Sequence, residues 1–200
     1  LPQETLREDI DRILHHCPGI QVHLDCGLGI DISLDELKER HDAVLLAIGS
    51  WWGKKMEIPG EDDKRVVDGV TFLRRVNGGE RPTLPESVVV IGGGDVAMDA
   101  CRVAKRLPGC KDVKVLYRRG PEEIPARRDE LHGAIKEGIE FVHFTQPTEI
   151  SADTDGFMLG CVKTELGDPE ADGRRRPILI PGSKHDIHCG MVITAVGQKG

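Results

Sequence analysis

The residues best suited to chemistry are three consecutive glycines, Gly92, Gly93 and Gly94, which follow the short apolar run Val88 to Ile91. Glycine at the first position allows a tight turn out of a strand, and at the third position it lets an anion approach the backbone. Ala97 is the small residue where a following helix must lie close to the strand. A helix beginning here would direct unpaired N–H groups and the positive end of its dipole toward such an anion.

This pattern is typical of the strand–loop–helix–strand unit that binds the pyrophosphate of a dinucleotide. We expect the pyrophosphate site to extend over the first helical turn, which includes Asp95 and Val96, and the second strand to be Val113 to Tyr117. The carboxylate of Asp95 would repel a pyrophosphate, so we expect it to point away and cap the helix. The alternative is a βαβ unit whose glycine-rich loop binds nothing.

The end of the second strand indicates which dinucleotide is bound. A carboxylate there would favour NAD, whereas basic residues accommodate the 2′-phosphate of NADP. This strand ends on Arg118 and Arg119, while Asp112 precedes the strand at its opposite end. Two adjacent guanidinium groups can bind a phosphate dianion through paired hydrogen bonds. We therefore expect NADP(H), with Arg127 or Arg128 as a further contributor; the alternative is a solvated basic turn.

The residues before this unit predict further elements of an α/β fold. Apolar residues at helical spacing predict a helix over Leu1 to Gly19, and Ile20 to Leu24 is expected to be a strand. Ser33 begins a capping-box pattern, which predicts a short helix to about Arg40. The apolar run Asp42 to Gly49 is typical of a buried parallel strand. Turn-forming residues near Ile58 mark a domain boundary.

The residues after the boundary alternate between expected helices and strands. Val66 to Asn77 and Arg127 to Glu137 are expected to be helices, and Ile139 to Phe144 the third strand of the unit. Pro147 is expected to interrupt the pattern, and three short strands of an antiparallel meander follow between Thr148 and Ile187. Within that meander the three consecutive arginines Arg174 to Arg176 are expected to form a solvated turn, beside acidic residues.

Composition excludes several classes of function. The 200 residues carry a net charge of −7, which argues against nonspecific nucleic-acid binding, and no apolar run is long enough to cross a membrane. The six cysteines form no CxxC pair, so we expect reduced thiols and a cytoplasmic protein. The cluster His185, His188 and Cys189 matches no metal-ligand template, and we name no metal site and no catalytic acid or base.

The sequence resembles the small (beta) subunit of NADPH-dependent glutamate synthase and its flavoprotein relatives, including the corresponding region of dihydropyrimidine dehydrogenase. The resemblance rests on VVVIGGGDVAMDACRVAKRL and VLYRRGPEEIPARRDELHGAIKEGIEF, and on the shorter motifs DAVLLAIGSW, IPGED and MVITAVGQ. It spans nearly the whole chain. It implies a Rossmann-like, three-layer NAD(P)-binding domain with an antiparallel meander, together with part of a nested FAD-binding domain.

The resemblance also implies a division of labour along the chain. Residues 1–58 would be a partial FAD-binding segment, 59–190 the NADP(H)-binding domain, and 191–200 a return segment toward the FAD-binding domain. Gly49 and Gly197 would lie near the flavin of the full-length parent. NADPH would deliver hydride to FAD, and electrons would pass to an iron–sulfur centre or to a partner like the large subunit of glutamate synthase. The chain looks like the middle piece of a longer protein, so we expect it to bind NADP(H) without turnover.

Two other hypotheses remain open from the residues. A non-enzymatic module that senses NADP(H) or docks a partner would use the same glycine-rich loop and the same arginines. A nucleotide-dependent transferase, such as a methyltransferase, would bind S-adenosylmethionine and would not depend on Arg118 and Arg119.

Overall fold

The computed structural model describes residues 3–169 and 173–199, and these form two compact units, Leu1–Ile48 and Gly49–Gly200. Unit 1 contains helices α1 (Gln3–His16) and α2 (Leu34–Arg40). Both helices were predicted, and both predictions are confirmed. The capping box forms as expected, because the Ser33 hydroxyl accepts from the Glu36 N–H at 3.1 Å and the Glu36 carboxylate accepts from the Ser33 N–H at 2.9 Å.

The two strands predicted in unit 1 are not formed. Residues 20–24 and 42–49 have no regular structure, with Leu24 80% exposed and Leu45 90% exposed. A buried parallel strand needs hydrogen-bonding neighbours at its edges and cover on both faces. In residues 3–48 no strand lies beside either run, so the apolar pattern has nothing to pair with.

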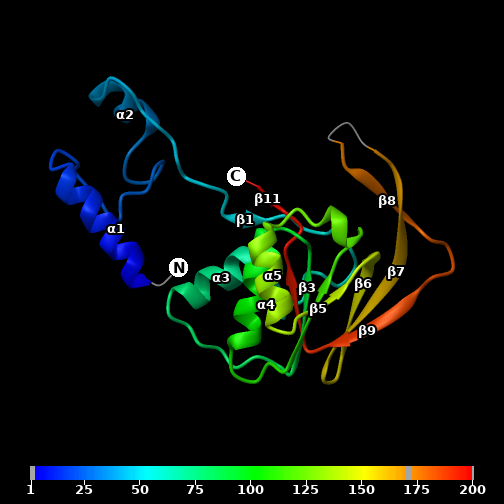
Figure 1. Cartoon of the computed structure of the whole chain (residues 1–200). Coiled ribbons are helices and arrows are strands. Elements are labelled where there is room, and N and C mark those ends of the chain that lie inside the picture. The colour runs from blue at the N-terminus through cyan, green and yellow to red at the C-terminus, as the bar shows by residue number, and fades with distance from the viewer. Residues whose placement is uncertain (1–2, 170–172, 200) are drawn as a thin grey trace. The chain divides into compact units, whose positions relative to one another are not determined.

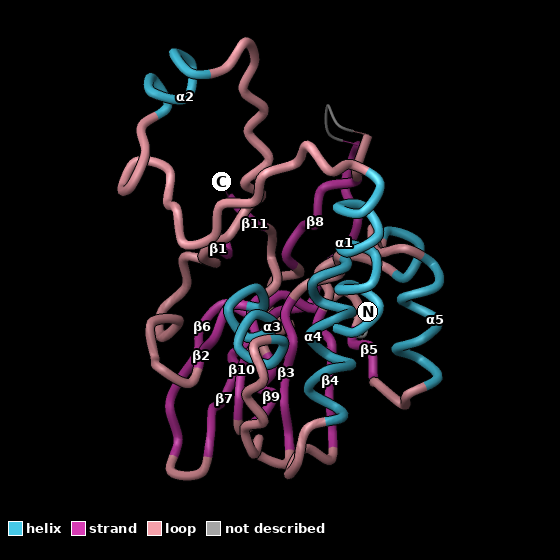
Figure 2. The backbone as a smooth tube through the Cα atoms, turned by 90° about the vertical axis from the view of Figure 1, so that its left-hand side faces the viewer, coloured by secondary structure: helices cyan, strands magenta, loops and turns pink. Residues whose placement is uncertain are grey.

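Unit 2 is built on a five-stranded parallel sheet in the order β2-β10-β3-β4-β5. The strands are β2 (Val66–Asp68), β3 (Ser87–Ile91), β4 (Asp112–Leu116), β5 (Glu140–Val142) and β10 (Met191–Thr194). Helices α3 (Gly69–Asn77), α4 (Asp95–Arg106) and α5 (Arg128–Lys136) lie along one face of the sheet, as Figures 1 and 2 show. The predicted strand–helix–strand unit is therefore confirmed.

A second, antiparallel sheet covers the other face of the parallel sheet (Figure 1). It contains β6 (Thr145–Asp153), β7 (Gly156–Pro169), β8 (Arg175–Leu179) and β9 (His185–Cys189), and the long strand β7 pairs with the other three. Strands β6, β7 and β8 pair in chain order as the expected three-stranded meander, and β9 is a fourth strand that pairs with β7. The helix–strand alternation ends near Pro147 as expected, but Pro147 itself lies within β6, beside a bulge, rather than between strands.

The alternation of side chains along β3 holds the three layers together. Val88 and Val90 face the helices, whereas Val89 and Ile91 pack in the cluster that includes Phe157 of the antiparallel sheet. All five side chains are buried. A strand covered on both faces reads as a continuous apolar run, as VVVI does here. These layers confirm the predicted α/β, Rossmann-like architecture.

Two expected elements have different bounds in the structure. The helix predicted from Val66 begins three residues later, because Val66–Asp68 forms β2 and pairs with β10. The Asp68 carboxylate then caps α3 by accepting a hydrogen bond from the Thr71 N–H at 3.0 Å. The third strand of the unit is shorter than predicted, and Phe144 beyond it has a left-handed φ of 52°.

The C-terminal segment contributes one strand to the parallel sheet and one strand to a separate small ribbon. The first residues of segment 191–200 form β10, between β2 and β3. β11 (Gln198–Lys199) then pairs with β1 (Trp52–Gly53) in a two-stranded antiparallel ribbon. The boundary expected at residue 190 therefore does not separate residues 191–194 from unit 2, and the two units divide at Ile48/Gly49 rather than near residue 58. The assignment of the N-terminal segment to an FAD-binding domain stays a prediction.

Candidate functional site

The turn from β3 into α4 requires glycine for two separate reasons. Gly92 has a φ of 141°, and a Cβ atom there would lie 2.2 Å from the Ala195 carbonyl oxygen. A Cβ atom on Gly93 would lie 2.7 Å from the ring of Tyr117. These two glycines let the loop pass between the end of β10 and the end of β4.

Gly94 differs from its neighbours because the space beside it is open. A Cβ atom there would meet nothing within 4 Å, and the backbone has an ordinary extended conformation with φ of −86°. Gly94 is the N-cap residue of α4, and no side chain caps the helix. The fold therefore tolerates a side chain here, and the open space lies at a helix N-terminus, where an anionic group fits.

Small buried residues hold α4 close to the sheet. Ala97 packs beneath the loop, and the rest of the buried face consists of Ala100, Cys101 and Ala104, all with no exposed surface. The Cys101 thiol donates to the Met98 carbonyl at 3.1 Å, and burial raises its pKa to about 12. This cysteine is a packing residue rather than a nucleophile.

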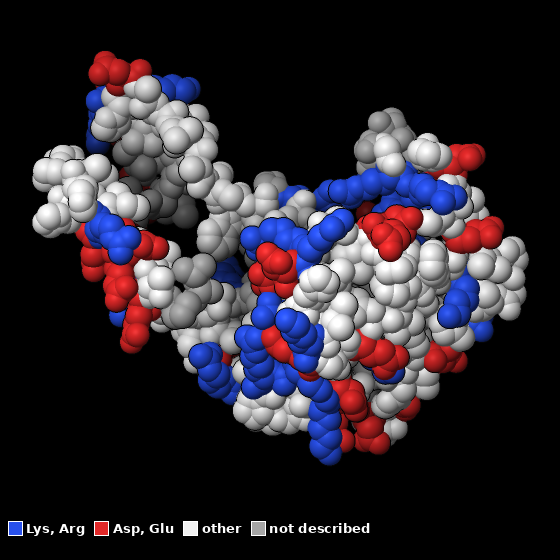
Figure 3. All heavy atoms as spheres, viewed as in Figure 1, with Lys and Arg blue, Asp and Glu red and all other residues white. Residues whose placement is uncertain are grey.

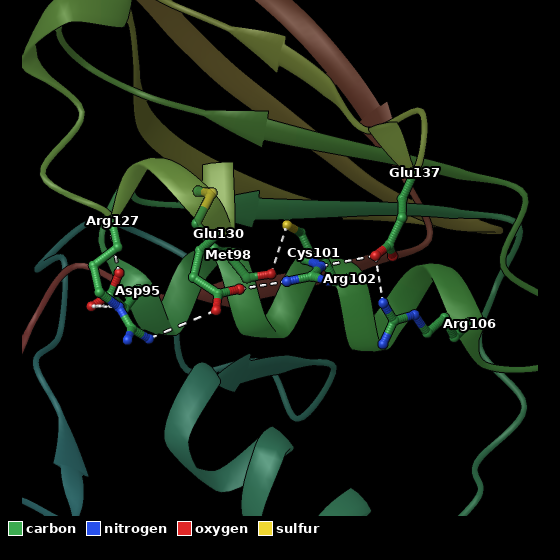
Figure 4. Close-up of polar contacts among 8 residues, drawn as sticks. All are labelled: Asp95, Met98, Cys101, Arg102, Arg106, Arg127, Glu130 and Glu137. Carbon is green, nitrogen blue, oxygen red and sulfur yellow. Dashed lines mark hydrogen bonds and ion pairs between the residues drawn. The ribbon is translucent and has the colours of Figure 1, made fainter. Parts of the chain in front are cut away.

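Asp95 does not cap its own helix, so that expectation was wrong. Its carboxylate accepts from the backbone N–H of Arg127 at 2.9 Å and lies 3.5 Å from the Arg127 guanidinium (Figure 4). The first turn of α4 is thereby connected to the start of α5. The positive charge of Arg127 offsets the carboxylate charge that would otherwise oppose an anion at Gly94.

An ion-pair cluster continues this connection along the two helices (Figure 4). Arg102 on α4 contacts Glu130 and Glu137, and Arg106 also contacts Glu137. Gly133 on α5 makes room, because a Cβ atom there would lie 2.9 Å from the Arg102 guanidinium carbon. Partial burial raises the pKa of Glu137, but the hydrogen bonds from Arg102 and Arg106 outweigh it, so the pKa lies below its ordinary value. The cluster fixes α5 against α4.

A pocket of about 510 Å³ lies at the carboxyl ends of β10, β3 and β4. Its walls come from residues 91–96, 116–119 and 194–198, which follow these three strands, and from residues 53–56 and 145–147. In open parallel sheets, ligands bind beyond the carboxyl ends of the strands. The volume is in the range of small-molecule and cofactor sites.

The pocket is basic, and its cations fall into two groups. Arg118 and Arg119 follow β4, and Arg174 precedes β8, whereas Lys54 and Lys55 lie beside the segment that follows β10. Figure 3 shows basic side chains gathered on unit 2 beside β8. Arg118 is exposed, but Arg119 is only 7% exposed, and its Nε donates to the Arg175 carbonyl at 2.7 Å. The two adjacent arginines therefore have different surroundings.

The pocket gathers most of the predicted site residues. Its lining contains Gly92, Gly93, Gly94, Asp95, Val96, Arg118, Arg119 and Gly197. Three predicted residues, Ala97, Arg127 and Gly49, are not part of the lining. Ala97 is buried beneath it, and the Arg127 side chain is paired with Asp95 and is 72% exposed.

Sequence reasoning missed Arg174 and the two lysines. Arg174 belongs to a run of three arginines that was expected to form a solvated turn, but Arg175 and Arg176 begin β8. The run of three arginines was visible in the sequence, but nothing near it indicated that Arg174 borders the pocket. Among the described residues, no three His, Cys, Asp or Glu side chains are grouped to hold a metal ion. The described helices also include none with the length and apolar character of a membrane span.

Comparison with known proteins places the chain among pyridine-nucleotide enzymes. It is 41% identical to the NADPH-Fe(3+) oxidoreductase subunit beta of Geobacter sulfurreducens, over 98% of this chain and 30% of that protein. It is 37% identical to the glutamate synthase [NADPH] small chain of Escherichia coli, over 90% of this chain and 40% of that protein. The predicted resemblance is confirmed, and the chain spans less than half the length of these relatives.

A solved structure of similar fold is that of Mycobacterium tuberculosis FprA in complex with NADPH, with a TM-score of 0.72, 22% identity, and coverage of 84% of this chain and 53% of that one. Thioredoxin reductase of Lactococcus lactis has a TM-score of 0.54, at 23% identity over 73% of this chain and 42% of that one. A sequence profile for pyridine nucleotide-disulphide oxidoreductases matches residues 5–200. The chain therefore belongs to the pyridine nucleotide-disulphide oxidoreductase family.

Proposed function

We propose that unit 2 binds NADP(H) in this pocket and presents its nicotinamide for hydride transfer to a flavin of the parent protein. The observation that carries the proposal is the open space at Gly94, which lies in the same pocket as Arg118 and Arg119. An anion-binding helix N-terminus and a basic strand end are the two features that a 2′-phosphorylated dinucleotide needs. The NADPH in the names of two relatives and in the FprA complex supports the same cofactor.

The pyrophosphate would lie over Gly94, at the first turn of α4. The N–H groups of a first helical turn have no intrahelical partners, and they point along the axis toward a bound anion. Arg127 supports this arrangement indirectly, because it holds the Asp95 carboxylate through the backbone and the guanidinium. Val96 contributes a pocket wall at the same turn.

The 2′-phosphate would lie at the end of β4. Arg118 and Arg119 border the pocket there, and Asp112 lies at the opposite end of the same strand. A carboxylate that could bond a ribose 2′-hydroxyl is therefore missing from the described lining near β4, which favours NADP(H) over NAD(H).

The nicotinamide would lie toward the end of β10, where apolar residues line the pocket. These are Met56, Ile58, Val70, Ala195 and Val196. The redox chemistry belongs to the nicotinamide and the flavin when both are bound, and the chain's own task is to hold and orient the donor. We assign no side chain as a catalytic acid or base.

FAD is proposed for the parent protein rather than for this chain alone. Of the two residues expected near a flavin, Gly197 borders the pocket and Gly49 does not. We propose that residues 1–48, which form unit 1, belong with an FAD-binding domain of the same polypeptide. Residues 191–194 form β10 inside the parallel sheet of unit 2, so they belong with the NADP(H)-binding domain proposed here. The onward acceptor would be an iron–sulfur centre or a partner like the glutamate synthase large subunit, and the names of the relatives as subunits support a redox partner.

Isothermal titration of the chain with NADP⁺, NAD⁺ and S-adenosylmethionine tests the proposal. We expect NADP⁺ to bind at least about tenfold more tightly than NAD⁺, since charge-assisted contacts to the 2′-phosphate are strong, and S-adenosylmethionine not to bind. Equal affinity for NADP⁺ and NAD⁺ would contradict the assignment of the basic strand end. Binding of S-adenosylmethionine alone would contradict the whole proposal.

A further inference from the structure

A third arginine reaches the basic end of the pocket from a distant part of the chain. Arg174 precedes β8 in the antiparallel sheet, yet it lines the pocket together with Arg118 and Arg119. Both Arg174 and Arg118 are exposed. Figure 3 shows the basic side chains that gather on this surface of unit 2.

Arg119 connects the start of β8 to the end of β4. Its Nε donates to the backbone carbonyl of Arg175 at 2.7 Å, and its own carbonyl accepts from the Phe144 N–H at 3.1 Å. A buried guanidinium is costly unless its donors are used, so this contact holds the residue after Arg174 at a fixed place. The start of β8 is therefore attached to the wall of the pocket.

The backbones on either side are also anchored to β7. The buried hydroxyl of Thr164 donates to the Arg118 carbonyl at 2.9 Å. The Arg175 guanidinium donates to the carbonyls of Gly167 and Leu166, both at 3.0 Å. Arg118 and Arg174 thus extend from two backbone segments that the same strand fixes, and both line the same pocket.

We propose that Arg174 is a further specificity-determining residue that binds, together with Arg118, the 2′-phosphate of an adenosine moiety. The inference rests on the proposed function and adds a residue from a second sheet to that site. A phosphate dianion offers enough oxygen acceptors for two guanidinium groups, and arginine's planar fork suits this geometry. Arg176 is the matched control, because it is an exposed arginine of the same run that does not line the pocket.

Titration with adenosine 2′,5′-bisphosphate and with ADP separates the 2′-phosphate contact from the rest of the site. We expect Arg174→Ala to weaken binding of the 2′,5′-bisphosphate by about tenfold and that of ADP by less than about twofold. Arg176→Ala should change neither affinity. Because both arginines would share one phosphate, the effects of Arg118→Ala and Arg174→Ala should not be additive in the double variant.

The outcomes distinguish this inference from the proposed function. If the wild-type chain prefers the 2′,5′-bisphosphate but Arg174→Ala behaves like Arg176→Ala, the inference is overturned and the proposed function stands. If the wild-type chain shows no such preference, the proposed function fails and the inference fails with it. Circular dichroism melting of each variant reports whether the fold is retained. We expect unchanged melting midpoints because the side chains of Arg118, Arg174 and Arg176 are all exposed.

Discussion

Gly94 and Gly92 should respond in opposite ways to the same substitution. Gly94→Ala adds a methyl group in open space at an ordinary φ, so the fold should be retained. The cost in unfolding free energy should not exceed about 1 kcal/mol, the typical difference between glycine and alanine at an N-cap. Gly92→Ala places a methyl group 2.2 Å from the Ala195 carbonyl oxygen at a φ of 141°, so it should destabilise unit 2 by several times more.

NADP⁺ binding should be far more sensitive than stability to the substitution at Gly94. The added methyl group on Gly94 fills the space proposed for the pyrophosphate and prevents at least one charge-assisted hydrogen bond from the first turn of α4. Such a bond contributes about 1.5–3 kcal/mol, so Gly94→Ala should weaken NADP⁺ binding by about 10- to 150-fold.

Calorimetric titration and thermal melting of the two variants provide the assay. The expected result for Gly94→Ala is a near-normal melting temperature with greatly weakened NADP⁺ binding. Wild-type affinity in a folded Gly94→Ala variant would refute the proposed pyrophosphate position. Failure of that variant to fold would refute the open space at Gly94.

Three further predictions concern charge and thiol reactivity. Arg118→Ala should reduce the preference for NADP⁺ over NAD⁺ in titrations by about tenfold, whereas Arg128→Ala, outside the pocket lining, should leave it unchanged. Glu137→Gln should lower stability by about 1–3 kcal/mol at pH 7. Folding lowers the pKa of Glu137 from its ordinary value of 4.5. The difference in unfolding free energy between the wild type and Glu137→Gln, measured by urea unfolding, should therefore shrink as the pH falls below about 4.5. A difference that stays constant with pH would count against the ion-pair cluster. Alkylation at pH 8, followed by mass spectrometry, should show the two exposed cysteines modified first. The reason is that burial raises the pKa of each buried thiol to about 11 or 12. Early modification of a buried thiol would contradict the packing. The exposed residues are Cys17 and Cys26, and the buried ones are Cys101, Cys161 and Cys189.

The elements that the sequence predicted well are those whose determinants are local. The run from Val88 to Tyr117 contains its own turn, its own small-residue helix face and its own second strand, so each part could be read without the rest of the chain. The capping box at Ser33 is equally local, because all of its partners lie within four residues. The glycines of the pocket were found for the same reason.

The predictions that were wrong or incomplete depend on distant partners. The apolar run 42–49 has a strand-like composition, but a strand also requires neighbours, and the described residues of unit 1 supply none. Asp95 was expected to cap its own helix, whereas its partner is Arg127 at the start of another helix. Arg174 lines the pocket because β8 pairs with β7 and Arg119 holds the Arg175 carbonyl, and no local pattern indicates either contact.

A crystal structure of the chain with NADP⁺ tests the central claim most directly. The account predicts the pyrophosphate within hydrogen-bonding distance of the backbone N–H groups at Gly94 and the start of α4, and the 2′-phosphate in contact with Arg118. A nucleotide bound away from Gly94, or bound with its 2′-phosphate in solvent and Arg118 unengaged, would contradict it.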